Sequence, residues 1–123
     1  VAQRVIEFPA GLVGDEPGKE DESMTTAAVR ELLEETGYET DTLEYLFDGV
    51  ISAGITDERI TYYLAPNCRK VGPGGGDGSE DIKTYAVPLQ DAVEWIEKRI
   101  SDDVTVDVKV ISILKFWLRQ PPC

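Results

Sequence analysis

The stretch Arg30-Glu31-Leu32-Leu33-Glu34-Glu35-Thr36-Gly37-Tyr38 decides the fold, because it predicts the end of a helix, a closing glycine and a following strand. On a helix, Glu31, Glu34 and Glu35 stand at positions i, i+3 and i+4, so their side chains share one face. Their like charges repel one another, and the C-terminal end of the helix dipole favours cations. This face therefore favours a hard cation such as Mg²⁺ or Mn²⁺, which takes oxygen ligands. The alternative is an ordinary glutamate-rich helix face that is simply solvated.

The composition is that of an acidic, globular chain of 123 residues without histidine. Hydrophobic residues make up 41 %, which suits one domain with a core. A net charge of −12, from 24 acidic and 12 basic residues, disfavours nucleic-acid binding. The lack of histidine excludes imidazole bases, Ser-His triads and most catalytic zinc sites. No apolar run is long enough for a membrane span, and two cysteines that form no framework suit a reducing cytoplasm.

The periodicity of the chain predicts alternating strands and helices. Ser23 is the expected N-cap of the glutamate-bearing helix, which runs to about Thr36 with Gly37 as its C-cap glycine. Its expected apolar positions are Met24, Ala28, Val29, Leu32 and Leu33. Strands are predicted over 4–8, 43–52, 59–65 and 82–87, the middle two as an antiparallel pair, and a second helix is predicted over 89–100 with Val93, Trp95, Ile96 and Ile100 as candidate core.

Two later segments are ambiguous. Residues 104–110 alternate like a strand, whereas Val110, Ile111, Leu114, Trp117 and Leu118 follow a helical stripe; a helix over about 106–118 is the prediction. The glycine-rich stretch 67–79 is expected to hold no regular structure. It is either a floppy connector or a mobile loop that brings a catalytic carboxylate into a site.

The stretch 30–38 resembles the core of the Nudix box, whose family pattern is G-x5-E-x7-R-E-U-x-E-E-x-G-U, with U aliphatic or aromatic. Glu22 stands where the pattern asks for its first glutamate. The matching glycine is Gly11, which is separated from Glu22 by ten residues where the family has five. The turn-forming residues within 14–21 are expected to hold a loop insertion.

Beyond the box, the chain resembles the ADP-ribose and ADP-sugar pyrophosphatase branch of that family. The segments that carry this likeness are Ile6–Leu12, Gly76–Glu80, Val87–Leu89 and Thr105–Asp107. This branch usually has Ser-Pro-Gly about 15 residues after the box, whereas this chain has Ser52-Ala53-Gly54. The departure leaves the exact substrate open and does not touch the hydrolytic residues.

The resemblance implies an α+β fold, an α/β/α sandwich with a mixed sheet between helices. Because several strands precede this point in the Nudix fold, the expectation is a single Nudix hydrolase domain over residues 1–123 that lacks its N-terminal portion. The implied assembly is a homodimer in the cytoplasm, with no nucleic-acid or membrane partner.

The implied function is Mg²⁺-dependent hydrolysis of the pyrophosphate bond of a nucleoside diphosphate sugar, with ADP-ribose giving AMP and ribose 5-phosphate; Mn²⁺ is the alternative metal. One rival is a Nudix hydrolase of nucleoside triphosphates or dinucleoside polyphosphates. The other is a regulatory module that binds a nucleotide sugar without cleaving it.

The resemblance also assigns roles to individual residues. Glu31 and Glu35 would be the main metal ligands, with Glu34 sharing a bridging or water-orienting role and the carbonyl of Ala10 completing a metal shell. Arg30 would hold the glutamates in place, or form an ordinary surface ion pair. Glu80, or failing that Asp81, would position the attacking water, the alternative being a solvated loop carboxylate. Implied substrate-binding residues are Gly11, Leu12 and Glu22, and Glu22 would act through water or by fixing Arg30.

Overall fold

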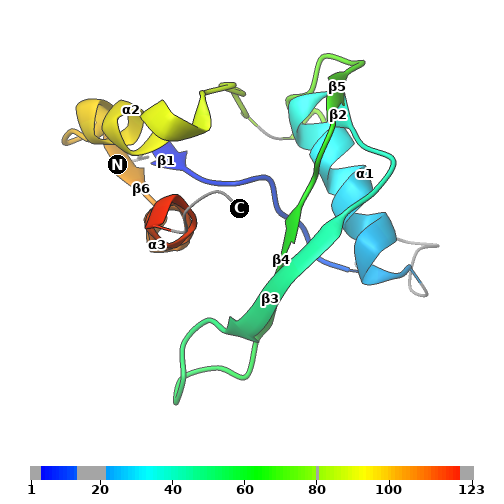
Figure 1. Cartoon of the computed structure of the whole chain (residues 1–123), viewed down its shortest axis with the longest axis horizontal. Helices are drawn as coiled ribbons and strands as arrows, with labels where there is room; N and C mark the ends of the chain where they lie inside the picture. The colour runs from blue at the N-terminus through cyan, green and yellow to red at the C-terminus, as the bar shows by residue number, and fades with distance from the viewer. Residues whose placement is uncertain (1–3, 14–21, 80, 120–123) are drawn as a thin grey trace. The chain divides into compact units, whose positions relative to one another are not determined.

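The computed structural model of the chain describes residues 4–13, 22–79 and 81–119 (Figure 1). The expected loop insertion within 14–21 and the candidate base Glu80 lie outside this part. Helices and short parallel and antiparallel sheets confirm the predicted α+β class. The α/β/α layering and the single-domain organisation stay predictions. Within the described ranges, no helix has the length and hydrophobicity that a membrane span requires.

The chain divides into two compact units, the first formed by Val1–Phe8 with Tyr85–Cys123. In this unit Ile96, Val110 and Leu114 are buried and form the core. Ile100, predicted as core, is 48 % exposed because the preceding helix ends at Arg99 and Ile100 is already extended. The elements of this unit are β1 (Arg4–Ile6), the short 3-10 helix η1 (Leu89–Asp91), α2 (Ala92–Arg99), β6 (Val104–Val106) and α3 (Val108–Arg119), with β1 and β6 paired in parallel.

The ambiguous segment near the C-terminus forms a short strand followed by a helix. The predicted helix is therefore present, but its predicted start at about residue 106 was wrong. Residues 104–106 form β6 and the helix begins at Val108. Asp107 separates the two, because its Oδ1 accepts from the backbone N–H of Lys109 at 2.8 Å. A side-chain hydrogen bond from Lys109 lowers the pKa of Asp107. The side chains of Trp117 and Leu118 lie outside the described part.

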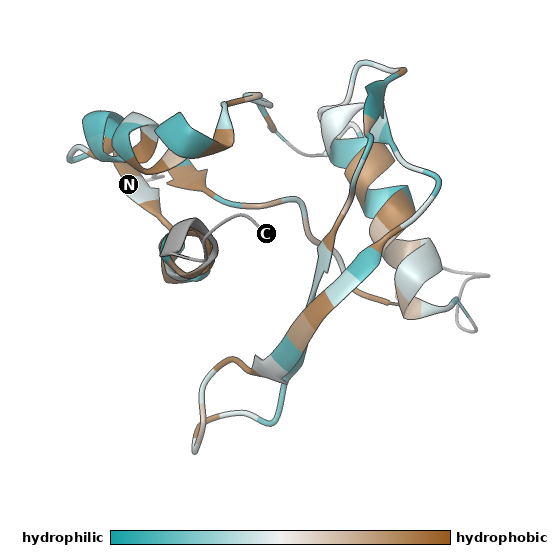
Figure 2. Cartoon of the chain, viewed as in Figure 1, coloured by the Kyte–Doolittle hydropathy of each residue, from teal (hydrophilic) through white to brown (hydrophobic). Residues whose placement is uncertain are grey.

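The second unit is Pro9–Thr84, and its described residues form the glutamate-bearing helix and four strands. The predicted antiparallel hairpin is confirmed: its strands are paired with a bulge between Tyr45 and Phe47. Figure 2 shows a hydrophobic band between hydrophilic residues along the first of these strands. The rings of Phe47 and Tyr62 lie 4.9 Å apart across the pair. The elements are α1 (Met24–Thr36), β2 (Tyr38–Glu39), β3 (Glu44–Val50), β4 (Arg59–Leu64) and β5 (Arg69–Lys70), with β3–β4 and β2–β5 both antiparallel.

Both predicted ends of α1 are confirmed. Ser23 Oγ accepts from the Thr26 N–H at 3.1 Å, as an N-cap side chain does. Gly37 has a left-handed φ of 77° and its N–H donates to the Leu33 carbonyl. The expected apolar face is less buried than its sequence suggests: Met24 and Leu33 are 47 % and 39 % exposed, whereas Ala27 is buried.

The glycine-rich stretch 67–79 is more ordered than predicted. Arg69 and Lys70 form β5, which pairs with β2. Beyond β5, the N–H groups of Gly75 and Gly76 donate to the carbonyls of Glu35 and Glu34, both at 2.8 Å. Left-handed φ values at glycines 74–76 allow these contacts. The stretch as far as Gly76 therefore closes the end of α1 rather than serving as a floppy connector.

The predicted strand over 82–87 is not formed. No strand among the described residues pairs with this segment, so its β-branched and aromatic residues have no ladder to join. The Thr84 hydroxyl instead donates to the Glu35 carbonyl at 3.2 Å.

Substituting Gly74→Ala should destabilise the second unit by about 1–3 kcal/mol. A Cβ at this position would lie 2.6 Å from the Thr36 carbonyl carbon, and φ is +68°. Urea denaturation measures the change. Gly78→Ala is the matched control in the same stretch, because a Cβ there meets no atom within 4 Å. Equal stability of the two variants would contradict the close packing of this loop on α1.

Candidate metal site on helix α1

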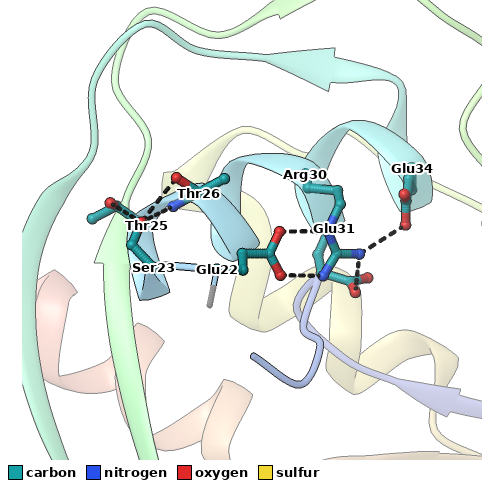
Figure 3. A network of polar contacts seen from close by, with 7 residues as sticks. All are labelled: Glu22, Ser23, Thr25, Thr26, Arg30, Glu31 and Glu34. Carbon is teal, nitrogen blue, oxygen red and sulfur yellow. Dashed lines mark hydrogen bonds and ion pairs between the residues drawn. The ribbon is translucent and has the colours of Figure 1, made fainter. Parts of the chain in front are cut away.

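Arg30 is the centre of the polar network on α1 (Figure 3). Its Nε and Nη2 donate to the two carboxylate oxygens of Glu22 at 2.8 and 2.9 Å. Its Nη1 donates to Glu31 Oε1 at 2.9 Å and to Glu34 Oε2 at 3.4 Å. One guanidinium therefore gathers three carboxylates, two of them from the acidic face that the sequence singled out.

The pair between Arg30 and Glu22 is largely removed from solvent. Their side chains are 11 % and 5 % exposed. Two parallel N–H···O bonds from one guanidinium to one carboxylate fix both groups in orientation as well as in distance. This geometry differs from the surface ion pair considered as the alternative for Arg30, because exposed pairs contribute little and hold no fixed geometry.

Glu35 and the segment before α1 form a second set of contacts. The backbone N–H of Ala10 donates to Glu35 Oε2 at 2.8 Å. A Cβ at Gly11 would lie 2.2 Å from the Glu31 carboxyl carbon, so the backbone at Gly11 lies directly against that side chain. The absence of a side chain at Gly11 is therefore what allows the segment to approach the acidic face. The structure brings together Ala10, Gly11, Glu22, Arg30, Glu31, Glu34 and Glu35 in this way.

Two further predicted site residues among those that the structure describes are exposed. Leu12 is 61 % exposed. Asp81 is exposed on the chain that follows the undescribed Glu80. The roles assigned to all these residues stay predictions, including the metal contact of the Ala10 carbonyl.

The candidate ligand atoms are of the chemical type that a hard divalent cation prefers. They are carboxylate oxygens, which Mg²⁺ and Mn²⁺ favour. The carboxylates of Glu31 and Glu34 both accept from the Nη1 of Arg30, which offsets part of their negative charge. In the part of the chain that the structure describes, no three acidic or thiol side chains converge closely enough to hold a metal ion between them.

Two side chains contact the end of α1 that were not predicted from the sequence to do so. Lys70 Nζ donates to the Thr36 carbonyl at 3.2 Å, and the Thr84 hydroxyl reaches the Glu35 carbonyl. Neither lies near the glutamates in sequence. The run of glycines between them was the available signal, because left-handed backbone there indicates a close approach to other backbone.

Replacing Arg30→Met should destabilise the protein by about 3–5 kcal/mol, because Glu22 would be left buried without its bidentate partner. The double variant Glu22→Gln/Arg30→Met should recover part of this loss. Urea denaturation of the single and double variants measures the coupling.

The control is Arg59→Met, which breaks an ion pair with Asp48 of the same 2.8 Å length but with side chains 62 % and 40 % exposed. Its expected cost is below about 1 kcal/mol. If Arg30→Met and Arg59→Met are equally mild, the Arg30 network does not organise this helix.

Comparisons with known proteins identify the family of the chain. A profile described as the NUDIX domain matches residues 2–107. A methanol dehydrogenase activator from Bacillus methanolicus is 40 % identical over 106 residues, which cover 83 % of this chain and 54 % of that protein. A GDP-mannose pyrophosphatase from Pectobacterium atrosepticum is 29 % identical over 119 residues, 94 % of this chain and 58 % of that enzyme.

A GDP-mannose pyrophosphatase from Escherichia coli is 34 % identical over 107 residues, 84 % of this chain and 52 % of the enzyme. The chain thus spans about half the length of the curated relatives it matches. The profile match covers most of the sequence, including the whole Arg30 network. The chain belongs to the NUDIX domain family.

Proposed function

We propose that this chain carries the catalytic glutamates of a Mg²⁺-dependent Nudix hydrolase that cleaves the pyrophosphate bond of a nucleoside diphosphate sugar. The observation that carries the proposal is the Arg30 network, in which one guanidinium arranges Glu22, Glu31 and Glu34 of the matched motif. Family members generally use divalent metal ions, and two of the relatives above are named as GDP-mannose pyrophosphatases.

The proposed roles are metal binding and proton transfer, and different residues carry them. Glu31, Glu34 and Glu35 would hold the metal, which would neutralise the pyrophosphate oxygens and lower the pKa of a bound water. Arg30 keeps Glu31 and Glu34 oriented toward one point. Glu80 or Asp81 would accept the proton of the attacking water, so that no histidine is required.

Within the proposed class of nucleoside diphosphate sugars, two substrates are supported by different observations. ADP-ribose, which would give AMP and ribose 5-phosphate, follows from the resemblance of the sequence. GDP-mannose, which would give GMP and mannose 1-phosphate, follows from the names of the relatives. The homodimer and the cytoplasmic location rest on the sequence alone and stay predictions.

A second candidate is a nucleotide-sugar-binding module that acts on another protein. The relative at 40 % identity supports it, since that protein is named as an activator of methanol dehydrogenase. Turnover separates the two candidates, whereas metal binding alone does not. Keeping three repelling carboxylates together favours the hydrolase, because a module freed from catalysis gains nothing from them.

We expect the chain to release nucleoside monophosphate from ADP-ribose or GDP-mannose with Mg²⁺ and not with EDTA. Glu35→Gln keeps the size of the side chain and removes a ligand charge, so turnover should fall by roughly a hundredfold or more. The matched control is Glu44→Gln, which removes the same charge from an exposed position on β3 and should leave the rate unchanged.

Turnover of ATP and of a dinucleoside polyphosphate, measured in the same assay, tests the rival hydrolase activities. Binding of a nucleotide sugar without turnover in the parent chain would overturn the proposal in favour of the binding module.

A further inference from the structure

The C-terminal carbonyls of α1, which a helix leaves without intrahelical partners, all accept hydrogen bonds here. The Leu33 carbonyl accepts from Gly37 N–H. The three that follow accept from one later segment of the chain, which we name the clamp: Lys70, Gly75, Gly76 and Thr84. The Glu34 carbonyl accepts from Gly76 N–H, that of Glu35 from Gly75 N–H and the Thr84 hydroxyl, and that of Thr36 from Lys70 Nζ.

The clamp acts on the part of the helix that most needs support. The last turn of α1 contains no basic residue, although a helix C-terminus is stabilised by cations. Glu34 and Glu35 lie in this turn and add negative charge to it. A terminal turn also frays more readily than the middle of a helix.

We infer that Thr84 is a positioning residue of the metal site: by holding the Glu35 carbonyl, it keeps the last turn of α1 formed and its two glutamates placed for a cation. This inference rests on the proposed function. A site that is formed in only a fraction of molecules binds its ligand more weakly by that same fraction. Loss of the Thr84 hydroxyl leaves the Gly75 N–H as the other described donor to the Glu35 carbonyl, so the last turn is formed in a smaller fraction of molecules and the apparent metal affinity falls without the removal of any ligand.

Thr84 gives a sharper test than Lys70. The charge of Lys70 acts directly on a cation, so its removal would change metal affinity for two opposite reasons. Thr84→Val keeps the shape of the side chain and removes only the hydroxyl donor. Thr84→Ser restores that donor and loses only a methyl group.

The experiment measures Mn²⁺ binding to the 123-residue chain by electron paramagnetic resonance, with hydrogen exchange of the Gly75 and Gly76 amides as the second readout. Thr84→Val should raise the dissociation constant for Mn²⁺ about two- to tenfold and speed exchange at both amides, as expected for one lost hydrogen bond. Thr84→Ser should return both values toward those of the parent. Thr105→Val, in β6 of the other unit, is the control and should change neither.

Each result has a definite meaning. An unchanged Mn²⁺ affinity in Thr84→Val, with the parent binding Mn²⁺, would overturn the inference and leave the proposed function standing. A loss of stability without a change in affinity would do the same, since it would show a purely structural role. A parent chain that binds no Mn²⁺ would overturn the proposed function and the inference together.

Discussion

Repulsion among the carboxylates of α1 is the constraint on which the rest of this structure depends. Glu31, Glu34 and Glu35 stand within one turn of one another, toward the end of the helix where its dipole also disfavours negative charge. Like-charge pairs at this spacing destabilise a helix by roughly 0.2–0.5 kcal/mol per pair. The helix persists because other parts of the chain supply hydrogen-bond donors and positive charge to this region.

These supports come from Arg30 on the helix itself and from segments outside the helix. Arg30 lies among the glutamates and is itself held by Glu22, which precedes the helix. The Ala10 N–H, from the segment after β1, donates to the Glu35 carboxylate. The clamp supplies donors to the carbonyls of the same turn. Glu34 and Glu35 are thus each held at both the carboxylate and the backbone carbonyl.

The sequence was sufficient to predict the local features of this region and insufficient for the distant ones. Ser23 and Gly37 were predicted because capping depends on a few neighbouring residues. The β3–β4 pair was predicted because its strands are adjacent in the chain and rich in aromatic and β-branched residues. The start of α3 was misplaced because residues 104–110 satisfy two periodicities, and pairing with β1 decides between them. The contacts of Lys70 and Thr84 with α1 could not be predicted, because they span 34 and 49 positions and depend on tertiary structure.

The most direct test of this account is the location of a bound metal ion. Paramagnetic broadening of backbone amide signals by Mn²⁺ measures which residues lie close to the ion. We expect the amides of Ala10, Gly11 and the last two turns of α1 to broaden first, at substoichiometric Mn²⁺. Broadening centred on another acidic group, such as Glu39 and Asp41 around Arg69, or spread evenly over the chain, would contradict the claim that α1 is built to hold a cation.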